Sequence, residues 1–151
     1  MRLRNLLALF LGVALAFMLF QPAARADQWN QMTELKFNQP VELPHVVLPA
    51  GSYWFVLENS PSSRDVVDVF SHNWKHEYAT FFTVPTTRPD STDQTVLIFA
   101  ERPHDQPEAL LKWYYPGRLT GHEFLYSPRH ERRFARDPKR TVEANGFSSR
   151  S

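Results

Sequence analysis

Prolines constrain the fold of this 151-residue chain more than any other feature of its sequence. Eleven of the twelve prolines lie after residue 26 and divide the rest of the chain into short segments. Because proline fixes φ and has no N–H to donate, it belongs at strand ends and turns rather than inside helices or central strands. The segments between the prolines are rich in valine, phenylalanine, tyrosine, tryptophan and threonine, which favour strands. The sequence therefore predicts many short strands.

Alternating side chains locate these strands. Apolar residues recur at every second position, as in strands that bury one face. We expect strands at residues 33–43 (interrupted by Pro40), 53–57, 66–70, 78–84, 95–100, 113–115 and 124–126. Residues 95–100 are apolar on both faces, which is typical of a central strand. The chain is expected to be all-β, as an antiparallel β-sandwich or small barrel of about 6–8 short strands.

Turn residues separate the expected strands. Gly51, after Pro49 and Ala50, is expected to take a positive φ in a turn, and Pro116-Gly117 predicts another turn. Asp105 followed three residues later by Glu108 resembles a helix start. We therefore expect a single helical turn there, leading into the strand that contains residues 113–115.

The first 26 residues resemble a secretory signal peptide. Two arginines near the N-terminus precede the uncharged apolar run Leu6–Phe20, and Ala24 and Ala26 suit a cleavage site. Export to the periplasm or the medium, with cleavage near Ala26, is expected. An uncleaved anchor is the alternative, although the run is shorter than the roughly 20 residues of a membrane span. No later stretch is apolar enough, so the mature chain is expected to lack a transmembrane span.

Charge divides the chain into three parts. The net charge of +1 hides an acidic body at residues 27–126, with 7 basic and 13 acidic residues, and a basic segment at residues 127–151, with 7 basic and 3 acidic residues. We expect a signal peptide at 1–26, a β domain at 27–126 and a flexible, mostly disordered basic tail at 127–151. A short amphipathic helix around residues 129–136 is the alternative for the tail.

Histidines and carboxylates form the candidate metal ligands. The chain has no cysteine, which excludes disulfide scaffolds, zinc–thiolate sites and cysteine nucleophiles. If two loops met, the ligands would be His104, Asp105, His122 and Glu123, joined by Glu101. His72 and His76 share a helical spacing, but they fall in a predicted hairpin loop, where that spacing has no meaning.

Aromatic residues are the other candidates for a site. Trp113, Tyr114 and Tyr115 could form a platform for sugars or other flat ligands, and the alternative is that they fill the core. The nucleophile elbow, the Walker loop and the dinucleotide loop are all absent from the sequence. An enzyme is therefore not the favoured interpretation, and no cofactor is expected.

Several short strings resemble one family. They include Leu48–Tyr53, Glu101–Pro103, Trp113–Gly117 and Gly121–Phe124. Together they resemble a family of small exported β-rich bacterial proteins of acidobacterial type, over about residues 1–126. The resemblance implies export and a β-rich fold. The family has no assigned activity, so no functional residue is carried over.

Three functional hypotheses follow. The first is a non-enzymatic binding or interaction module of the cell envelope, whose partner is an envelope glycan, a lipid or a protein rather than a specific nucleic acid. The second is a small metal-binding protein or metal-dependent enzyme that uses the His104, Asp105, His122 and Glu123 cluster. The third is a structural or assembly protein that acts by pairing its strand edges with a partner.

Overall fold

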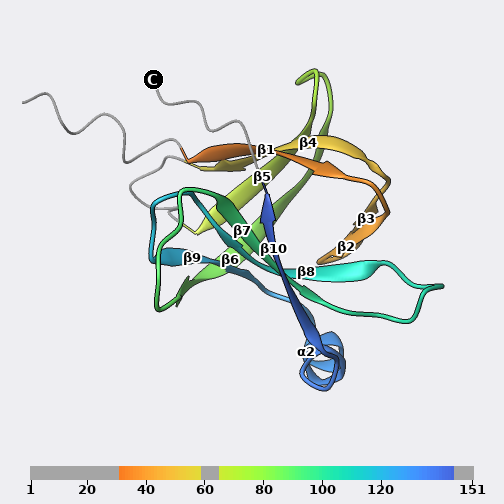
Figure 1. The fold of residues 1–151 in the computed structure, drawn as a ribbon. Helices are drawn as coiled ribbons and strands as arrows, with labels where there is room; N and C mark the ends of the chain where they lie inside the picture. The colour runs from red at the N-terminus through yellow and green to blue at the C-terminus, as the bar shows by residue number, and fades with distance from the viewer. Residues whose placement is uncertain (1–30, 59–64, 145–151) are drawn as a thin grey trace, which may run out of the picture.

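The protein is all-β, as the alternation predicts (Figure 1). The computed structural model describes residues 31–58 and 65–144, and the predicted signal peptide lies outside them. The described strands are β1 (Met32–Phe37), β2 (Val41–Leu43), β3 (Val46–Leu48), β4 (Gly51–Leu57), β5 (Val66–Ser71), β6 (Glu77–Thr87), β7 (Thr95–Ala100), β8 (Glu108–Tyr114), β9 (Thr120–Phe124) and β10 (Lys139–Ala144). The described helix is α2 (Pro128–Phe134). These ten strands exceed the predicted number, because residues 41–48 form a hairpin and the tail adds β10.

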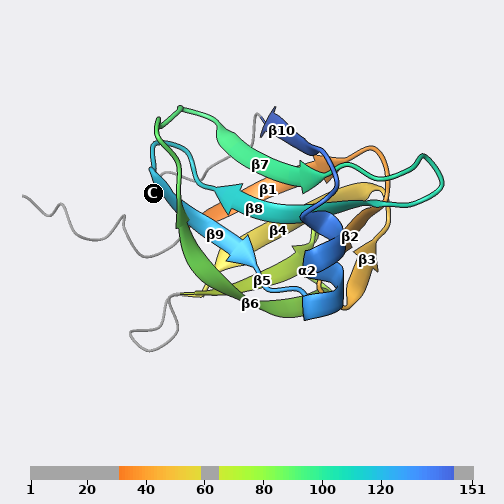
Figure 2. The same cartoon turned by 90° about the horizontal axis from the view of Figure 1, so that it is seen from below.

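The long strand β6 joins two halves of one sheet. Its first part pairs with β5, in a half ordered β1-β4-β5-β6, and its second part pairs with β9. On the far side of β9 lies β8, which pairs with β7, and β7 pairs with β10. The sheet is mixed rather than purely antiparallel, since β2 runs parallel to β8 over two residue pairs. The two halves face each other in the view from below (Figure 2).

The core fills the space between these halves. Phe55 on β4 is fully buried and packs edge-on against Trp113 on β8, with ring centroids 6.1 Å apart. Phe55 also meets Phe124 on β9 at 6.4 Å. In an antiparallel ladder, inward side chains alternate with outward ones, and β1 follows this rule with Thr33, Leu35 and Phe37 buried. The described core therefore comes from packing rather than from cross-links.

The prediction of a disordered tail from residue 127 is wrong for residues 127–144. Helix α2 buries Phe134, and all six residues of β10 pair with β7. The physical reason is that β7 offers an unpaired edge and the core offers an apolar position for the one aromatic residue of α2. The alternative helix around residues 129–136 is confirmed. The folded domain thus extends past residue 126, and residues 145–151 lie outside the described residues.

Two smaller predictions also need correction. Asp105 begins no helix, because the Gln106 N–H donates to the Pro103 carbonyl in a turn and β8 starts at Glu108. Gly51 starts β4 without a positive φ, whereas Gly117 has a φ of 72° as its turn requires. Residues 95–100 are confirmed as a central strand between β8 and β10. No helix in the described part of the chain is long and apolar enough to cross a membrane.

Candidate functional site

The predicted aromatic platform is not a surface. Trp113 has no exposed area and Tyr114 is only 4% exposed, while Tyr115 is half-buried. The Trp113 ring lies between Phe55 and His122, with centroids 6.1 Å and 5.7 Å away. Trp113 therefore fills the core, whereas Tyr114 is covered on the opposite face of β8 by Arg88 and the backbone of Gly121. The platform interpretation is wrong for both residues because both are buried.

The candidate metal ligands do not meet. His104 and Asp105 are exposed on the loop before β8, whereas His122 and Glu123 lie on β9, opposite Trp113 and Lys112 at the other end of β8. The five residue steps from Glu108 to Trp113 span roughly 16 Å of strand. No group of three or more histidines and carboxylates within residues 31–58 and 65–144 is arranged to hold a metal ion.

His122 and Glu123, the two candidate ligands on β9, each have a structural role instead. His122 is 9% exposed, and its Nδ1 lies 3.3 Å from the Thr83 hydroxyl. Burial lowers the pKa of His122, and the charge of Asp65 opposes this shift only in part. Glu123 forms an ion pair with Lys112 at 3.1 Å. His72 lies in the hairpin loop, as predicted, and pairs with Glu34.

Helix α2 carries the strongest concentration of charge. Phe134 fixes the helix to the body, since it is 2% exposed and packs edge-on against Tyr126 at 4.9 Å. The Tyr126 hydroxyl in turn donates to the carbonyl groups of Glu42 and Leu110, at 3.0 Å and 2.8 Å. Burial, with the charge of Glu42, raises the pKa of Tyr126, so this hydroxyl stays protonated as a donor.

A nearly buried guanidinium reinforces this attachment. The Arg102 side chain is 5% exposed and lies over the Phe134 ring, with its central carbon 5.4 Å from the centroid. Its Nε lies 3.6 Å from Asp137, which follows α2, and its Nη1 lies 4.0 Å from Glu42 on β2. Arg102 therefore joins β2, the core and the end of α2.

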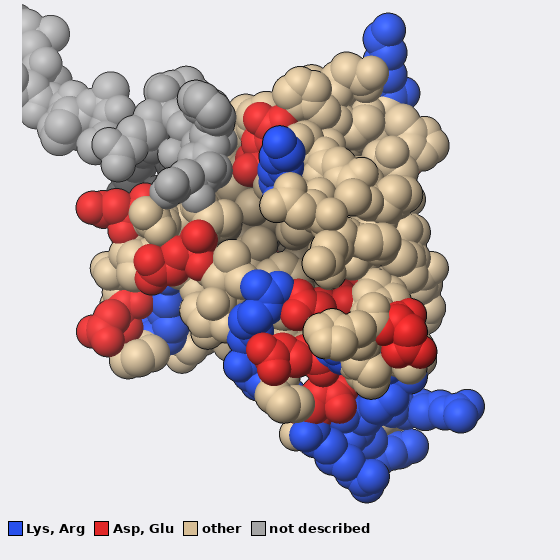
Figure 3. All heavy atoms as spheres, turned by 45° about the vertical axis from the view of Figure 1, so that its right-hand side comes forward, with Lys and Arg blue, Asp and Glu red and all other residues tan. Residues whose placement is uncertain are grey.

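The outer side of α2 is cationic and mostly uncompensated. Arg133 and His130 each lie 3.8 Å from Glu42, which offsets part of the charge. Arg129, Arg132 and Arg136 are exposed and make no ion pair with any described residue. Lysine and arginine gather over α2 at the lower end of the molecule (Figure 3). We call Arg129 and Arg132 on the helix, with Arg136 two residues after its last residue, the α2 arginines.

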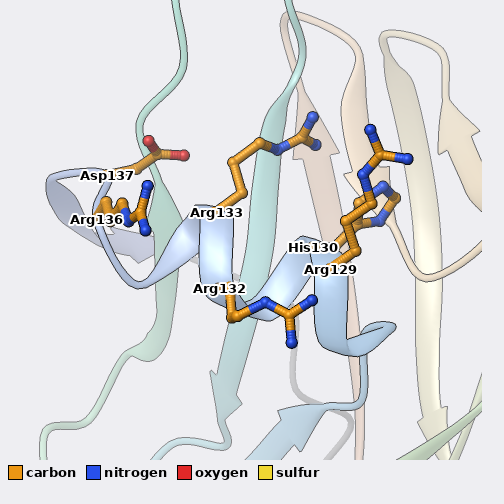
Figure 4. Close-up of a pocket in the computed structure, with 6 residues that line it drawn as sticks. All are labelled: Arg129, His130, Arg132, Arg133, Arg136 and Asp137. Carbon is orange, nitrogen blue, oxygen red and sulfur yellow. The ribbon is translucent and has the colours of Figure 1, made fainter.

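These side chains surround a shallow hollow. Its volume is about 370 Å³, and it is lined by Arg129, His130, Arg132, Arg133, Arg136 and Asp137. Arg132 points away from the strands, whereas Arg133 extends toward them (Figure 4). Arg129 leaves the helix beside His130 at its start (Figure 4). Guanidinium groups thus lie around the hollow along the length of α2, and they point in different directions (Figure 4).

An apolar groove lies beside this surface. Its volume is about 440 Å³, and it is lined by Pro44, His45, Val46, Tyr78, Ala79, Thr80, Phe81, Phe82 and Leu125. Phe82 is 71% exposed and Leu125 is 43% exposed, which is unusual for such large apolar side chains. We call this the Phe82 groove. The sequence pattern of β6 was its signal, because apolar residues alternate on both faces of residues 78–84.

A second groove lies between two sheet edges. No described strand pairs with the outer edge of β1 or of β10. The groove between them has a volume of about 550 Å³ and is lined from both strands, by Leu35 and Phe37 on one side and Arg140, Val142 and Ala144 on the other. We call this the edge groove.

Comparison with protein-family models, with curated proteins and with solved structures finds no match for this chain. The resemblance to exported β-rich proteins therefore stays a prediction. Sequence reasoning missed α2 as a fixed surface. The available signal was Phe134, a large aromatic residue within a run of arginines.

Proposed function

We propose that this protein is an exported, non-enzymatic binding module of the cell envelope that holds an anionic, phosphate-bearing partner on α2. One observation carries the proposal: the α2 arginines project from an anchored helix with no carboxylate partner among the described residues. Guanidinium groups suit phosphate, because their planar set of donors matches its oxygens in pairs.

The anchoring supports binding rather than mere solubility. A flexible basic tail loses conformational freedom when it binds, which offsets part of the gain. Here Phe134 and Arg102 already hold the helix in place, so the arginines are ordered before a ligand arrives. The acidic body also favours this arrangement, since its net negative charge disfavours the binding of an anion away from α2.

The test is titration of residues 27–151, which include every described element, with soluble polyphosphate. The variant Arg129→Ser/Arg132→Ser/Arg136→Ser should weaken binding about 100-fold, since each arginine near an anionic surface contributes about 1 kcal/mol. The control Lys36→Ser/Lys75→Ser/Arg118→Ser removes the same charge elsewhere and should weaken binding far less. Equal losses in the two variants would show that net charge, and not α2, accounts for binding.

The edge groove favours a second candidate function, the assembly role. Hydrogen bonds alternate along antiparallel strands, and the Glu101 N–H donates to the Pro138 carbonyl. Since Pro138 is bonded to the β7 side, the residues whose backbone groups point away from β7 are Lys139, Thr141 and Glu143. An extended segment of a partner protein could therefore add to β10 and cover the apolar lining of the groove.

Proline substitution tests this second candidate. Thr141→Pro removes an outward N–H, which an edge position tolerates, whereas Thr141→Val keeps it. If strand addition occurs, cross-linking to envelope proteins in cells should disappear in Thr141→Pro and persist in Thr141→Val. Equal cross-linking in both variants, with both proteins folded, would refute strand addition at β10.

A further inference from the structure

We propose that the anionic partner is a bilayer surface, and that the Phe82 groove inserts into it while the α2 arginines bind lipid phosphates. This inference rests on the proposed function, because it names the partner of the α2 surface. It adds an apolar half to the site, and this half distinguishes a membrane partner from a soluble phosphorylated polymer.

The apolar half is formed where β6 changes partner. β5 begins at Val66, opposite Phe82, and from Thr83 onward β6 pairs with β9 instead. Phe82 therefore lies at the bend of the sheet, and its ring is covered by neither half. Next to it, the β2–β3 hairpin turns through Pro44 and His45, whose φ of 65° marks a tight turn, and contributes Val46 to the groove.

The apolar and cationic halves are contiguous. The Leu125 N–H donates to the Phe82 carbonyl at 3.4 Å, and Ser127, two residues later, caps the start of α2. On the other side, Arg133 contacts Glu42, which stands two residues before Pro44. The chain thus passes from Leu125 of the Phe82 groove to the N-cap of α2 within two residues, and the Arg133–Glu42 contact links α2 to the strand that precedes Pro44.

Charge complementarity identifies the occupant. Exposed aromatic and aliphatic side chains beside a group of arginines are the pattern of proteins that lie on anionic membranes. A soluble polyphosphate or an acidic glycan would satisfy the arginines but would leave Phe82 and Leu125 in water. A bilayer with anionic headgroups covers both, because acyl chains lie directly beneath its phosphates.

The experiment compares vesicles of phosphatidylcholine with vesicles that also contain phosphatidylglycerol, using residues 27–151 in a sedimentation assay. Binding to the anionic vesicles is expected, and Phe82→Ser/Leu125→Ser should weaken it about tenfold or more. The same variant should bind soluble polyphosphate as tightly as the unmodified protein. Leu119→Ser is the control, because Leu119 is about as exposed as Leu125 but lies roughly 20 Å from it at the other end of β9.

Insertion itself can be observed, because the chain has no cysteine and a single one can be labelled. A polarity-sensitive dye on Phe82→Cys should brighten and shift to the blue on anionic vesicles, whereas the same dye on Leu119→Cys should not.

If polyphosphate binds but vesicles do not, or if the dye at Phe82→Cys does not respond, the bilayer inference is overturned and the α2 proposal stands. If neither probe binds, both proposals fail.

Discussion

Substitution of Arg102 by alanine tests whether the buried guanidinium holds α2 to the body. The side chain is 5% exposed and lies between Glu42 and Asp137, whose own side chains are 16% and 25% exposed. It also donates to Gln106 and covers one face of the Phe134 ring. Arg102→Ala therefore removes an ion-pair partner from two half-buried carboxylates and leaves a void beside Phe134.

The structure sets the size of the effect. Removal of one partner from a buried ion pair costs about 3–5 kcal/mol. Glu42 keeps Arg133 and His130 at 3.8 Å, and Asp137 is partly hydrated, so we expect the lower value of about 3 kcal/mol for Arg102→Ala. For a domain of this size, that corresponds to a fall in Tm of roughly 10–15 °C.

Denaturant unfolding followed by tryptophan fluorescence gives the free energy of unfolding, since Trp113 is buried in the core. Arg132→Ala is the matched control, because Arg132 is exposed on the same helix, and it should change stability by less than about 0.5 kcal/mol. A double-mutant cycle with Asp137→Ala isolates the pair. If Arg102→Ala and Arg132→Ala have the same free energy of unfolding, the anchoring role of Arg102 is refuted.

Three further predictions concern stability. In chemical denaturation, Gly121→Ala should lower the free energy of unfolding by about 3 kcal/mol or more, because a Cβ there would lie 2.6 Å from the Trp113 carbonyl oxygen. Gly117→Ala should lower it by about 1–2 kcal/mol, because Gly117 has open space around it but a positive φ. His122 has a lowered pKa, so the unfolded chain takes up its proton first and stability should fall as the pH drops below about 6.5; His122→Gln should flatten this loss in Tm measurements, and exposed His104→Gln should not. Addition of a chelator should leave Tm unchanged, and a fall would revive the metal hypothesis.

Pro85 shows how far strand boundaries could be predicted from the positions of prolines in the sequence. Most prolines of the described part lie between strands, as expected, but Pro85 lies inside β6. The Leu125 N–H donates to Phe82, so alternate residues of β6 face β9 and Pro85 faces the other side. β5 begins at Val66, opposite Phe82, and does not extend to Pro85, so the absent N–H of Pro85 costs no hydrogen bond. Local pattern predicts strands, whereas the partner of each strand is a long-range property.

The candidate sites failed for a related reason. Trp113 and Tyr114 end β8 and Tyr115 follows it, and alternation assigns neighbouring residues to opposite faces but does not say which face is covered. The structure covers both, because the core lies on one side and Gly121 lets the backbone of β9 approach Tyr114 on the other. His104, on the loop before β8, and His122, on β9, lie beside opposite ends of β8, and the spacing of residues in the sequence does not reveal this separation.

The tail carries the clearest lesson about charge. Net charge and composition favoured a disordered segment from residue 127, because charged residues outnumber apolar ones there. A charged segment folds when it can bury enough apolar surface against the rest of the domain. Here three features hold residues 127–144 in place: buried Phe134, nearly buried Arg102 and the open edge of β7. Folding places three exposed arginines on and just after an anchored helix. A detached tail would bind polyphosphate and anionic vesicles alike, whereas the proposed anchored surface predicts that vesicle binding falls in Phe82→Ser and polyphosphate binding does not.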